Sequence, residues 1–288
     1  MIFVLGGNDL EMEVTKQLLA MAGRRFVQPK KKWGDHSYTP GDLGLQPKDT
    51  SMSWIGTGRR KYKTLLDPAT GSEFEGAFFV ECRPSGWEGF EYQSPSSGIA
   101  SYNTEWSIDH HGEEAHRPPS VLQVLSILEE DGFNISNSTR RWVELVAAND
   151  SGYIPAMLRI GATPEEVSRV RAADRAAQGI TVSQEAEAER AIASAEKLDS
   201  GLLVVRLAHS KCATITDRLF GTWPDGRENL LVLSGDGESN YFGDGAICAS
   251  LKEKFQGSWG GGSGFAKAGE SAFWGGYAPQ DEVLKLIR

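Results

Sequence analysis

The chain has 288 residues, of which 40% are hydrophobic and 24% are charged, a composition typical of a globular protein with room for two ordinary domains. Its formal net charge of −9 argues against long nucleic acid as a partner, because wrapping a polyphosphate requires many Lys and Arg contacts. The apolar run at residues 1–5 is too short to span a bilayer and has no basic flank, so neither a membrane partner nor a signal peptide is predicted.

The first third of the chain contains two short apolar runs and one amphipathic segment. Residues 2–5 predict a buried first strand, and apolar side chains at helical spacing predict a helix over 9–21. Residues 30–75 are polar and interrupted by Gly, Pro and Trp, which indicates loops and short strands. Residues 77–80 predict a second buried strand, with Glu81 at its carboxyl end.

The middle of the chain begins with a third strand and is otherwise helical. Residues 105–108 predict a strand that runs directly into Asp109-His110-His111. Apolar spacing and two capping-box patterns predict four helices after it: one that opens at Pro118-Pro119, one over 139–148, and two that begin at Thr163 and Thr181.

The last third returns to strands after a polar turn at residues 199–201. Strands are predicted at 202–207, 230–233 and 241–248, followed by a short helix around Leu251 and a final helix over 280–287. Strands that alternate with helices predict an α/β fold with partly parallel sheets. We place the domain boundary at the polar turn, which gives domains 1–198 and 199–288.

The cysteines indicate the compartment. There are three of them, widely spaced and without a C-x-x-C pair, so neither a disulfide framework nor a zinc ribbon is predicted. This pattern favours a reducing, cytoplasmic location. The sequence leaves the oligomeric state open, and a homo-oligomer is compatible with it.

Asp109-His110-His111 is the strongest candidate for chemistry. A strand that ends here brings a carboxylate and two imidazoles to the carboxyl edge of a sheet, where open α/β folds build their sites. Carboxylate oxygen and imidazole nitrogen both suit Mn²⁺. Asp150, in a turn after an apolar helix, and Glu81 supply further acids. The alternatives are two loop histidines at a strand end, a helix stop around Asp150 and an exposed structural glutamate.

A glycine-rich segment lies near the C-terminus. Gly260, Gly261 and Gly262 would let backbone N–H groups approach an anion closely, and Lys267 would add a positive charge. The alternative is a flexible turn between a helix and a strand.

Together these residues resemble the DHH phosphoesterases. Asp109-His110-His111 matches the strand-borne Asp-His-His of the family, Asp150 resembles its later turn aspartate, and Glu81 stands where the family generally has an aspartate. Residues 260–269 are similar to the G-G-G-x-x-x-x-A-A-G stretch of the family's C-terminal domain, with Lys267 in place of an alanine. The order and spacing of these motifs cover most of the chain.

The resemblance implies an N-terminal parallel-sheet DHH-like domain and a smaller C-terminal α/β substrate domain. It implies metal ligands at His110, Asp150, Glu81 and Asp9, a phosphate-facing His111, and an Asp109 that orients a histidine. It also implies substrate binding by Gly260, Gly261, Gly262 and Lys267. The family's His-x-x-x-Asp-x-Asp element is incomplete here, because residues 5–11 contain only the acid pair Asp9 and Glu11. We therefore expect one divalent metal at most, as Mn²⁺.

Three hypotheses about function follow from these expectations. The first is a metal-dependent phosphoesterase (a hydrolase) acting on a short oligonucleotide or a small phosphorylated nucleotide. The second is a nucleotide-binding or regulatory protein that keeps the fold but has lost catalysis. The third is a different α/β enzyme that uses Glu81 and Asp109 as acid and base.

Overall fold

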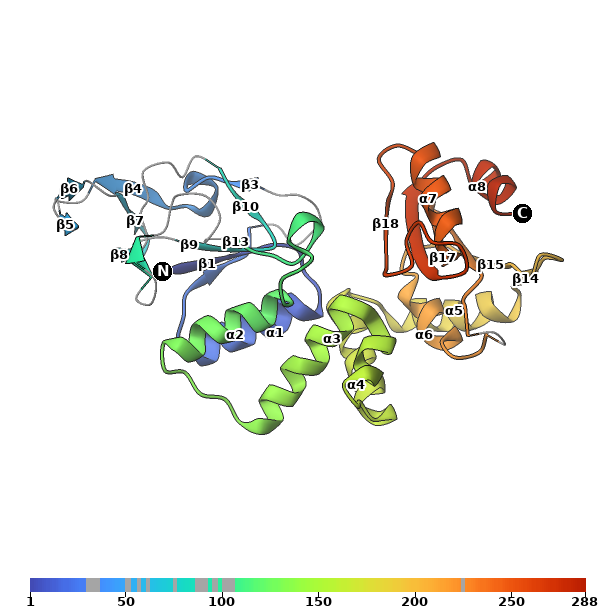
Figure 1. Cartoon of the computed structure of the whole chain (residues 1–288), viewed down its shortest axis with the longest axis horizontal. Helices are drawn as coiled ribbons and strands as arrows, with labels where there is room; N and C mark the ends of the chain where they lie inside the picture. The colour runs from blue at the N-terminus through green and yellow to red at the C-terminus, as the bar shows by residue number, and fades with distance from the viewer. Residues whose placement is uncertain are drawn as a thin grey trace. The chain divides into compact units, whose positions relative to one another are not determined.

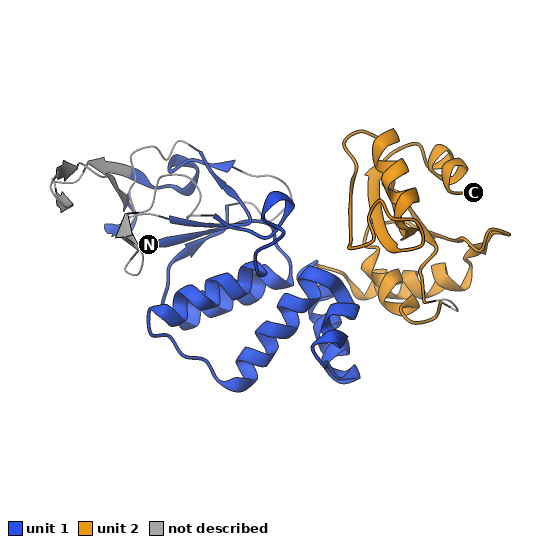
Figure 2. Ribbon diagram, viewed as in Figure 1, with its two compact units in different colours: residues 1–178 blue, residues 179–288 orange. Residues whose placement is uncertain are grey.

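The computed structural model describes residues 1–29, 37–49, 53–55, 58–60, 63–74, 77–85, 93–94, 98–99, 107–223 and 226–288. The chain forms two compact units, residues 1–178 and 179–288 (Figure 2). The division lies before the polar turn at 199–201, because helix α5 (Val182–Ala193) belongs to the second unit. Its Ala188 and Ala191 are buried there against Val205 and Ile215.

Unit 1 is built on a parallel sheet with strand order β13-β9-β1-β2. Its strands are β1 (Ile2–Leu5), β2 (Phe26–Val27), β9 (Ala77–Val80) and β13 (Ser107–Ile108). The predicted strands at 2–5 and 77–80 are confirmed, and of the predicted strand at 105–108 residues 105 and 106 lie outside the described residues. Every residue of β1 and β9 is buried, as expected of parallel strands that are covered on both faces.

The two faces of this sheet are covered differently. On one face Ile2, Val4, Ala77 and Phe79 pack with Tyr38 and other side chains of the segment between β2 and β9. Helices α1 (Leu10–Met21) and α2 (Ser120–Glu130) lie side by side along the other face (Figure 1). Helices α3 (Asn137–Arg159) and α4 (Pro164–Ala177) then pack against α1.

The long segment between β2 and β9 consists of short strands and a 3₁₀ turn in its described parts, as predicted for 30–75. The elements are β3 (Ser37–Tyr38), η1 (Gly41–Leu43), β4 (Gln46–Asp49), β5 (Ser53–Ile55), β6 (Gly58–Arg60), β7 (Lys63–Asp67) and β8 (Ser72–Phe74). The strands β10 (Arg83–Pro84), β11 (Gln93–Ser94) and β12 (Gly98–Ile99) follow β9, and η2 (Gly112–Glu114) follows β13. These short strands form small sheets that are separate from the four-stranded parallel sheet.

The two capping boxes predicted from the sequence are confirmed, and an unpredicted cap starts α1. Thr163 and Thr181 form complete capping boxes, and the Asp9 carboxylate accepts a hydrogen bond from the Met12 N–H (2.8 Å) at the start of α1. Helix α3 runs well beyond the predicted 139–148, because the chain resumes helical structure after a break at Gly152. No helix in the described ranges combines the length and the apolar character needed to cross a membrane.

Unit 2 contains a mixed sheet with strand order β14-β15-β16-β17-β19-β18, in which β15 and β16 run parallel. The strands are β14 (Glu196–Lys197), β15 (Leu203–Leu207), β16 (Leu230–Ser234), β17 (Glu238–Asp244), β18 (Trp259–Gly261) and β19 (Ser271–Tyr277). Helices α5 and α6 (Ala213–Leu219) cover one face, while α7 (Gly245–Lys254) and α8 (Gln280–Ile287) cover the other. The predicted final helix is confirmed.

Two expectations about unit 2 were wrong or incomplete. The strand predicted over 241–248 ends at Asp244, because that carboxylate caps α7 by accepting from the Ala246 and Ile247 N–H groups (2.9 and 3.3 Å). Strand β19 was not predicted from the sequence. In the structure a Cβ on Gly275 would lie 2.4 Å from Trp259 Nε1, so this glycine makes room for an indole beside the strand.

Gly6 offers a test of the contact between the ends of β1 and β9. Its N–H donates to the Val80 carbonyl (2.9 Å), and a Cβ there would lie 2.5 Å from the Glu81 carbonyl oxygen. We expect Gly6→Ala to lower the free energy of unfolding by about 1–3 kcal/mol, because the backbone must shift. Urea denaturation measures this, with Gly41→Ala as control, since a Cβ on Gly41 meets no atom closer than 3.7 Å. Equal stability of the two variants would contradict the prediction.

Candidate metal centre

Four segments bring polar side chains together in unit 1. Asp9 and Glu11 follow β1, Glu81 follows β9, and Asp109-His110-His111 follows β13. Because these strands are parallel, their carboxyl ends meet at one edge of the sheet. Asp150 comes from α3, which packs against α1 and α2.

His110 lies at the centre of the cluster. Its Nε2 is 2.8 Å from Asp150 Oδ2, 3.5 Å from Glu11 Oε2 and 3.5 Å from Glu81 Oε1. The His110 side chain is only 8% exposed, and those of Glu11 and Glu81 are 0% and 5% exposed. Three carboxylates therefore approach one imidazole nitrogen in a nearly closed space.

The facing atoms lack hydrogen bonds. Within the described part of the chain, the buried side-chain atoms here without a hydrogen-bond partner are Asp9 Oδ2, Glu11 Oε2, Glu81 Oε1, His110 Nε2 and Asp150 Oδ2. His110 Nε2 and Asp150 Oδ2 are close but are not aligned for a hydrogen bond. Buried polar atoms normally find partners, so such a group of unsatisfied oxygens and one ring nitrogen fits a bound cation.

The ligand atoms form two overlapping sets. Glu11, His110 and Asp150 make one, and Glu81, His110 and His111 make the other, with the ligand atoms of each set within 4.8 Å of one another. Carboxylate oxygens and imidazole nitrogens are the ligands that divalent first-row metals take. The chain thus contains buried Glu, His and Asp side chains that could hold a metal ion.

Electrostatics agree with this assignment. Burial and the nearby Glu81 and Asp150 charges raise the pKa of Asp9 to about 8, and burial together with Glu11 also raises the pKa of Glu81. Burial alone would lower the pKa of His110, but the Asp150, Glu11 and Glu81 carboxylates outweigh it and raise the pKa to about 12. These shifts show that the cluster disfavours further negative charge and favours a bound positive charge or protons.

Unusual backbone conformations occur at Glu81 and close to Asp150. Glu81 has φ 53°, uncommon for a residue other than glycine, while its N–H donates to the Ile108 carbonyl (2.9 Å). Asp150 precedes a break in α3, where Tyr153 has φ 57°. A Cβ on Gly152 would lie 2.8 Å from Ala156 Cβ, so this position in the break requires glycine. The sequence predicted Asp150 in a turn after the helix, with a helix stop as the alternative. In the structure Asp150 lies within α3, and the break follows it at Gly152 and Tyr153 before the helix resumes.

Asp109 and His111 lie beside the cluster. Asp109 Oδ1 accepts from the N–H groups of His110 (2.7 Å) and His111 (2.9 Å) and lies 3.1 Å from His111 Nδ1. Burial opposes ionisation, but these hydrogen bonds lower the pKa of Asp109, and the same contact raises the pKa of His111. The His111 side chain is 46% exposed, so a ligand can reach it.

Glu11, more than Asp9, reaches His110. One Asp9 oxygen caps α1 and the other is buried near Glu81 and Asp150, whereas Glu11 Oε1 accepts from the Val121 N–H (2.9 Å) and Glu11 Oε2 faces His110. The sequence analysis assigned Asp9 as the ligand of this acid pair, whereas Glu11 is the member that faces His110. The signal that could distinguish them is the capping position, because an N-cap aspartate is already engaged with the helix.

No protein-family model and no curated protein matches the sequence. The resemblance to DHH phosphoesterases therefore rests on the motifs of the sequence itself. The geometry of unit 1 brings together the residues of those motifs that were assigned to metal binding, namely His110, Asp150 and Glu81, with Asp9 close by.

The residues assigned to substrate binding lie in unit 2. Gly260 and Gly261 belong to β18 and pair with β19, and Gly262 follows with φ 101°. A Cβ on Gly260 would lie 2.8 Å from the Phe265 ring, and one on Gly261 would lie 3.3 Å from the Phe273 ring. Lys267 is exposed and lies 3.4 Å from Glu270 Oε2. Strand pairing and aromatic packing thus account for two of the glycines, and their role in binding stays a prediction.

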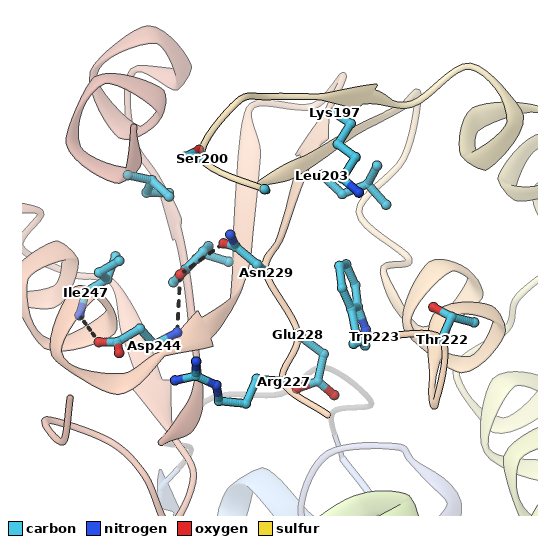
Figure 3. Close-up of a pocket in the computed structure, with 13 residues that line it drawn as sticks. Lys197, Ser200, Leu203, Thr222, Trp223, Arg227, Glu228, Asn229, Asp244 and Ile247 are labelled. Atoms are coloured by element: carbon cyan, nitrogen blue, oxygen red, sulfur yellow. Dashed lines mark hydrogen bonds between the residues drawn. The ribbon is translucent and has the colours of Figure 1, made fainter. Parts of the chain in front are cut away.

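A separate cavity of about 700 Å³ lies in unit 2 (Figure 3). Apolar walls come from Leu203 and Trp223, and polar ones from Lys197, Arg227 and Asn229. Its lining does not include the glycine segment 260–262 or Lys267. The cavity and the glycine segment are therefore distinct features of this unit.

The protonation of His110 can be measured directly. In protein kept metal-free with EDTA, we expect the imidazole to stay doubly protonated between about pH 5 and 9, because its pKa of about 12 lies far above the ordinary 6.5. The attraction between the carboxylates and the His110 imidazolium should contribute its full stabilisation of the fold below pH 6.5, the ordinary pKa. This contribution should be lost only as the pH rises through the folded-state pKa of about 12. Ring ¹⁵N shifts report the state, and Asp150→Asn should lower the pKa. A His110 that titrates near 6.5 would contradict the account.

Proposed function

We propose that unit 1 binds one Mn²⁺ ion through Glu11, Glu81, His110 and Asp150, with Asp9 as an adjacent acid, and that the protein is a metal-dependent phosphoesterase. The substrate class is a short oligonucleotide or a small phosphorylated nucleotide. The observation that carries the proposal is the group of buried ligand atoms around His110 Nε2 that lack hydrogen bonds within the described residues. In this proposal unit 1 is the DHH-like catalytic domain and unit 2 the substrate domain.

The donor set supports a single manganese ion. It is rich in carboxylate oxygen with one imidazole nitrogen, which suits Mn²⁺ better than the sulfur-rich sites of softer metals. Both ligand sets contain His110, whose Nε2 has one lone pair and can bind one ion. The missing histidine of the first sequence motif removes a donor for a second ion.

The cation, His111 and Asp109 would have different roles in hydrolysis. Bound Mn²⁺ would polarise the phosphoryl oxygens and activate water for attack. With Nδ1 held by Asp109, His111 would present Nε2 to a phosphate oxygen, and its raised pKa favours the cationic, donating form. Asp109 already makes three contacts within its own turn, which suits a supporting role rather than acid–base catalysis with Glu81.

Charge imposes an order on binding. Four acids lie around His110, where a phosphate would have to approach the ion: Asp9, Glu11, Glu81 and Asp150. Like charges repel, so an anionic substrate should bind only after a divalent cation has offset the carboxylates.

Manganese binding is the first test. We expect isothermal titration of EDTA-treated, dialysed protein with Mn²⁺ to give about one site per chain, because only one imidazole nitrogen is shared by the ligand sets. His110→Ala and Asp150→Ala should abolish the site. His116→Ala is the matched control, since this exposed histidine has its Nδ1 3.2 Å from the Glu113 carbonyl oxygen and belongs to neither ligand set. A wild-type protein without Mn²⁺ binding refutes the metal centre.

Hydrolysis is the second test. A panel of 5′-phosphorylated dinucleotides, short oligonucleotides and nucleoside bisphosphates with Mn²⁺ should reveal a substrate. For that substrate His111→Asn should lower kcat by about 10²–10³-fold, the range for loss of one hydrogen-bond donor to a developing charge, while Mn²⁺ affinity changes little. A protein that binds Mn²⁺ and nucleotides but hydrolyses none of them would instead be the binding or regulatory protein of the second hypothesis.

A further inference from the structure

The part of α3 that carries Asp150 is held on both sides. Asn149 precedes Asp150 and is 9% exposed, and Tyr153 follows it in a left-handed conformation with φ 57°. Such a conformation costs on the order of 1–3 kcal/mol in a residue other than glycine, so the surroundings must enforce it.

Arg171 contacts both flanking residues. It comes from α4, is 7% exposed, and donates from Nη1 to Asn149 Oδ1 (2.8 Å). Its guanidinium carbon lies 4.6 Å from the centre of the Tyr153 ring. The same Nη1 is 2.8 Å from Asp174 Oδ2, which neutralises the buried charge.

An arginine is suited to this position. Its planar guanidinium can donate in its own plane to Asn149 and Asp174 while one flat face covers the Tyr153 ring. Helix α4 is itself tied to the loop that carries Asp9, because the Asn8 amide donates to the Ala177 carbonyl (3.2 Å). Helix α4 thus contacts two of the segments that supply acids to the metal centre, through Arg171 at one and Ala177 at the other.

We propose that Arg171 is a positioning residue of the metal centre. Arg171 donates a hydrogen bond to Asn149 and lies over the Tyr153 ring, which fixes the part of α3 between these two residues. The Asp150 carboxylate is thereby held 2.8 Å from His110 Nε2. This inference rests on the proposed metal site. It assigns a role to a helix that carries none of the sequence motifs.

The test measures Mn²⁺ affinity by isothermal titration in four proteins besides the wild type. Arg171→Met removes the guanidinium and with it the positive charge beside the buried Asp174 carboxylate, so the principal variant is Arg171→Met combined with Asp174→Asn. Asp174→Asn alone is its reference, and Arg171→Lys keeps the charge without the flat face. Arg169→Met, an exposed arginine of the same helix that lies over Trp142, is the matched control.

We expect the double variant to bind Mn²⁺ about 10–100-fold more weakly than Asp174→Asn, as is typical when a group that orients a ligand is lost. Arg171→Lys should be intermediate and Arg169→Met unchanged. Circular dichroism and thermal unfolding in EDTA verify that the folded state persists. A residue that only stabilised the fold would change the melting temperature without this graded loss of affinity.

The outcomes separate the two claims. Wild-type protein that binds Mn²⁺, with a folded double variant that binds equally well, overturns the role of Arg171 and leaves the metal site intact. Wild-type protein that binds no Mn²⁺ refutes the metal site and the positioning role with it. If the double variant does not fold, Arg171→Lys decides, and wild-type affinity in that variant overturns the proposal.

Discussion

The crowding of carboxylates around one imidazole nitrogen is the constraint on which unit 1 depends. Glu11, Glu81 and Asp150 approach His110 Nε2 in a nearly closed space, and Asp9 lies beside them. Two like charges about 4 Å apart repel by roughly 4 kcal/mol at the effective dielectric constant of a protein surface, so several of them cannot share a buried edge without a counterion or protons. Burial and then repulsion by Glu81 raise the pKa of Asp9, while attraction by the surrounding carboxylates outweighs burial and raises the pKa of His110. A divalent cation would satisfy all these groups at once.

The fold is arranged to deliver those groups. Parallel strands bring the ends of β1, β9 and β13 to one edge, and Gly6 allows β1 and β9 to approach closely there. Unfavourable backbone conformations occur at Glu81 and Tyr153, on or next to the proposed ligands. Strain of this kind persists where the surroundings enforce it, and it is concentrated at functional sites. Both faces of the sheet in unit 2 are covered by helices. Among the described residues of that unit, Ala266 is the one residue other than glycine with a positive φ.

Much of this arrangement could be predicted from local patterns. The buried strands at 2–5 and 77–80 and the capping boxes at Thr163 and Thr181 follow from apolar runs and from short-range chemistry. The meeting of His110, Glu81 and Asp150 follows from motifs at strand and helix ends. The role of Arg171 could not be predicted, because Asn149 and Tyr153 lie on another helix. No short sequence motif predicts a contact between α3 and α4. Strand β19 and the allocation of α5 to unit 2 also depend on packing between distant segments rather than on local propensity.

Anomalous diffraction from crystals grown with Mn²⁺ tests the central claim most directly. Data collected at the manganese absorption edge locate the ion without any assumption about activity or substrate. The account predicts one anomalous peak in unit 1, within bonding distance of His110 Nε2 and of oxygens from Glu11, Glu81 and Asp150. A map without a peak there, or with manganese bound only elsewhere on the molecule, would contradict it.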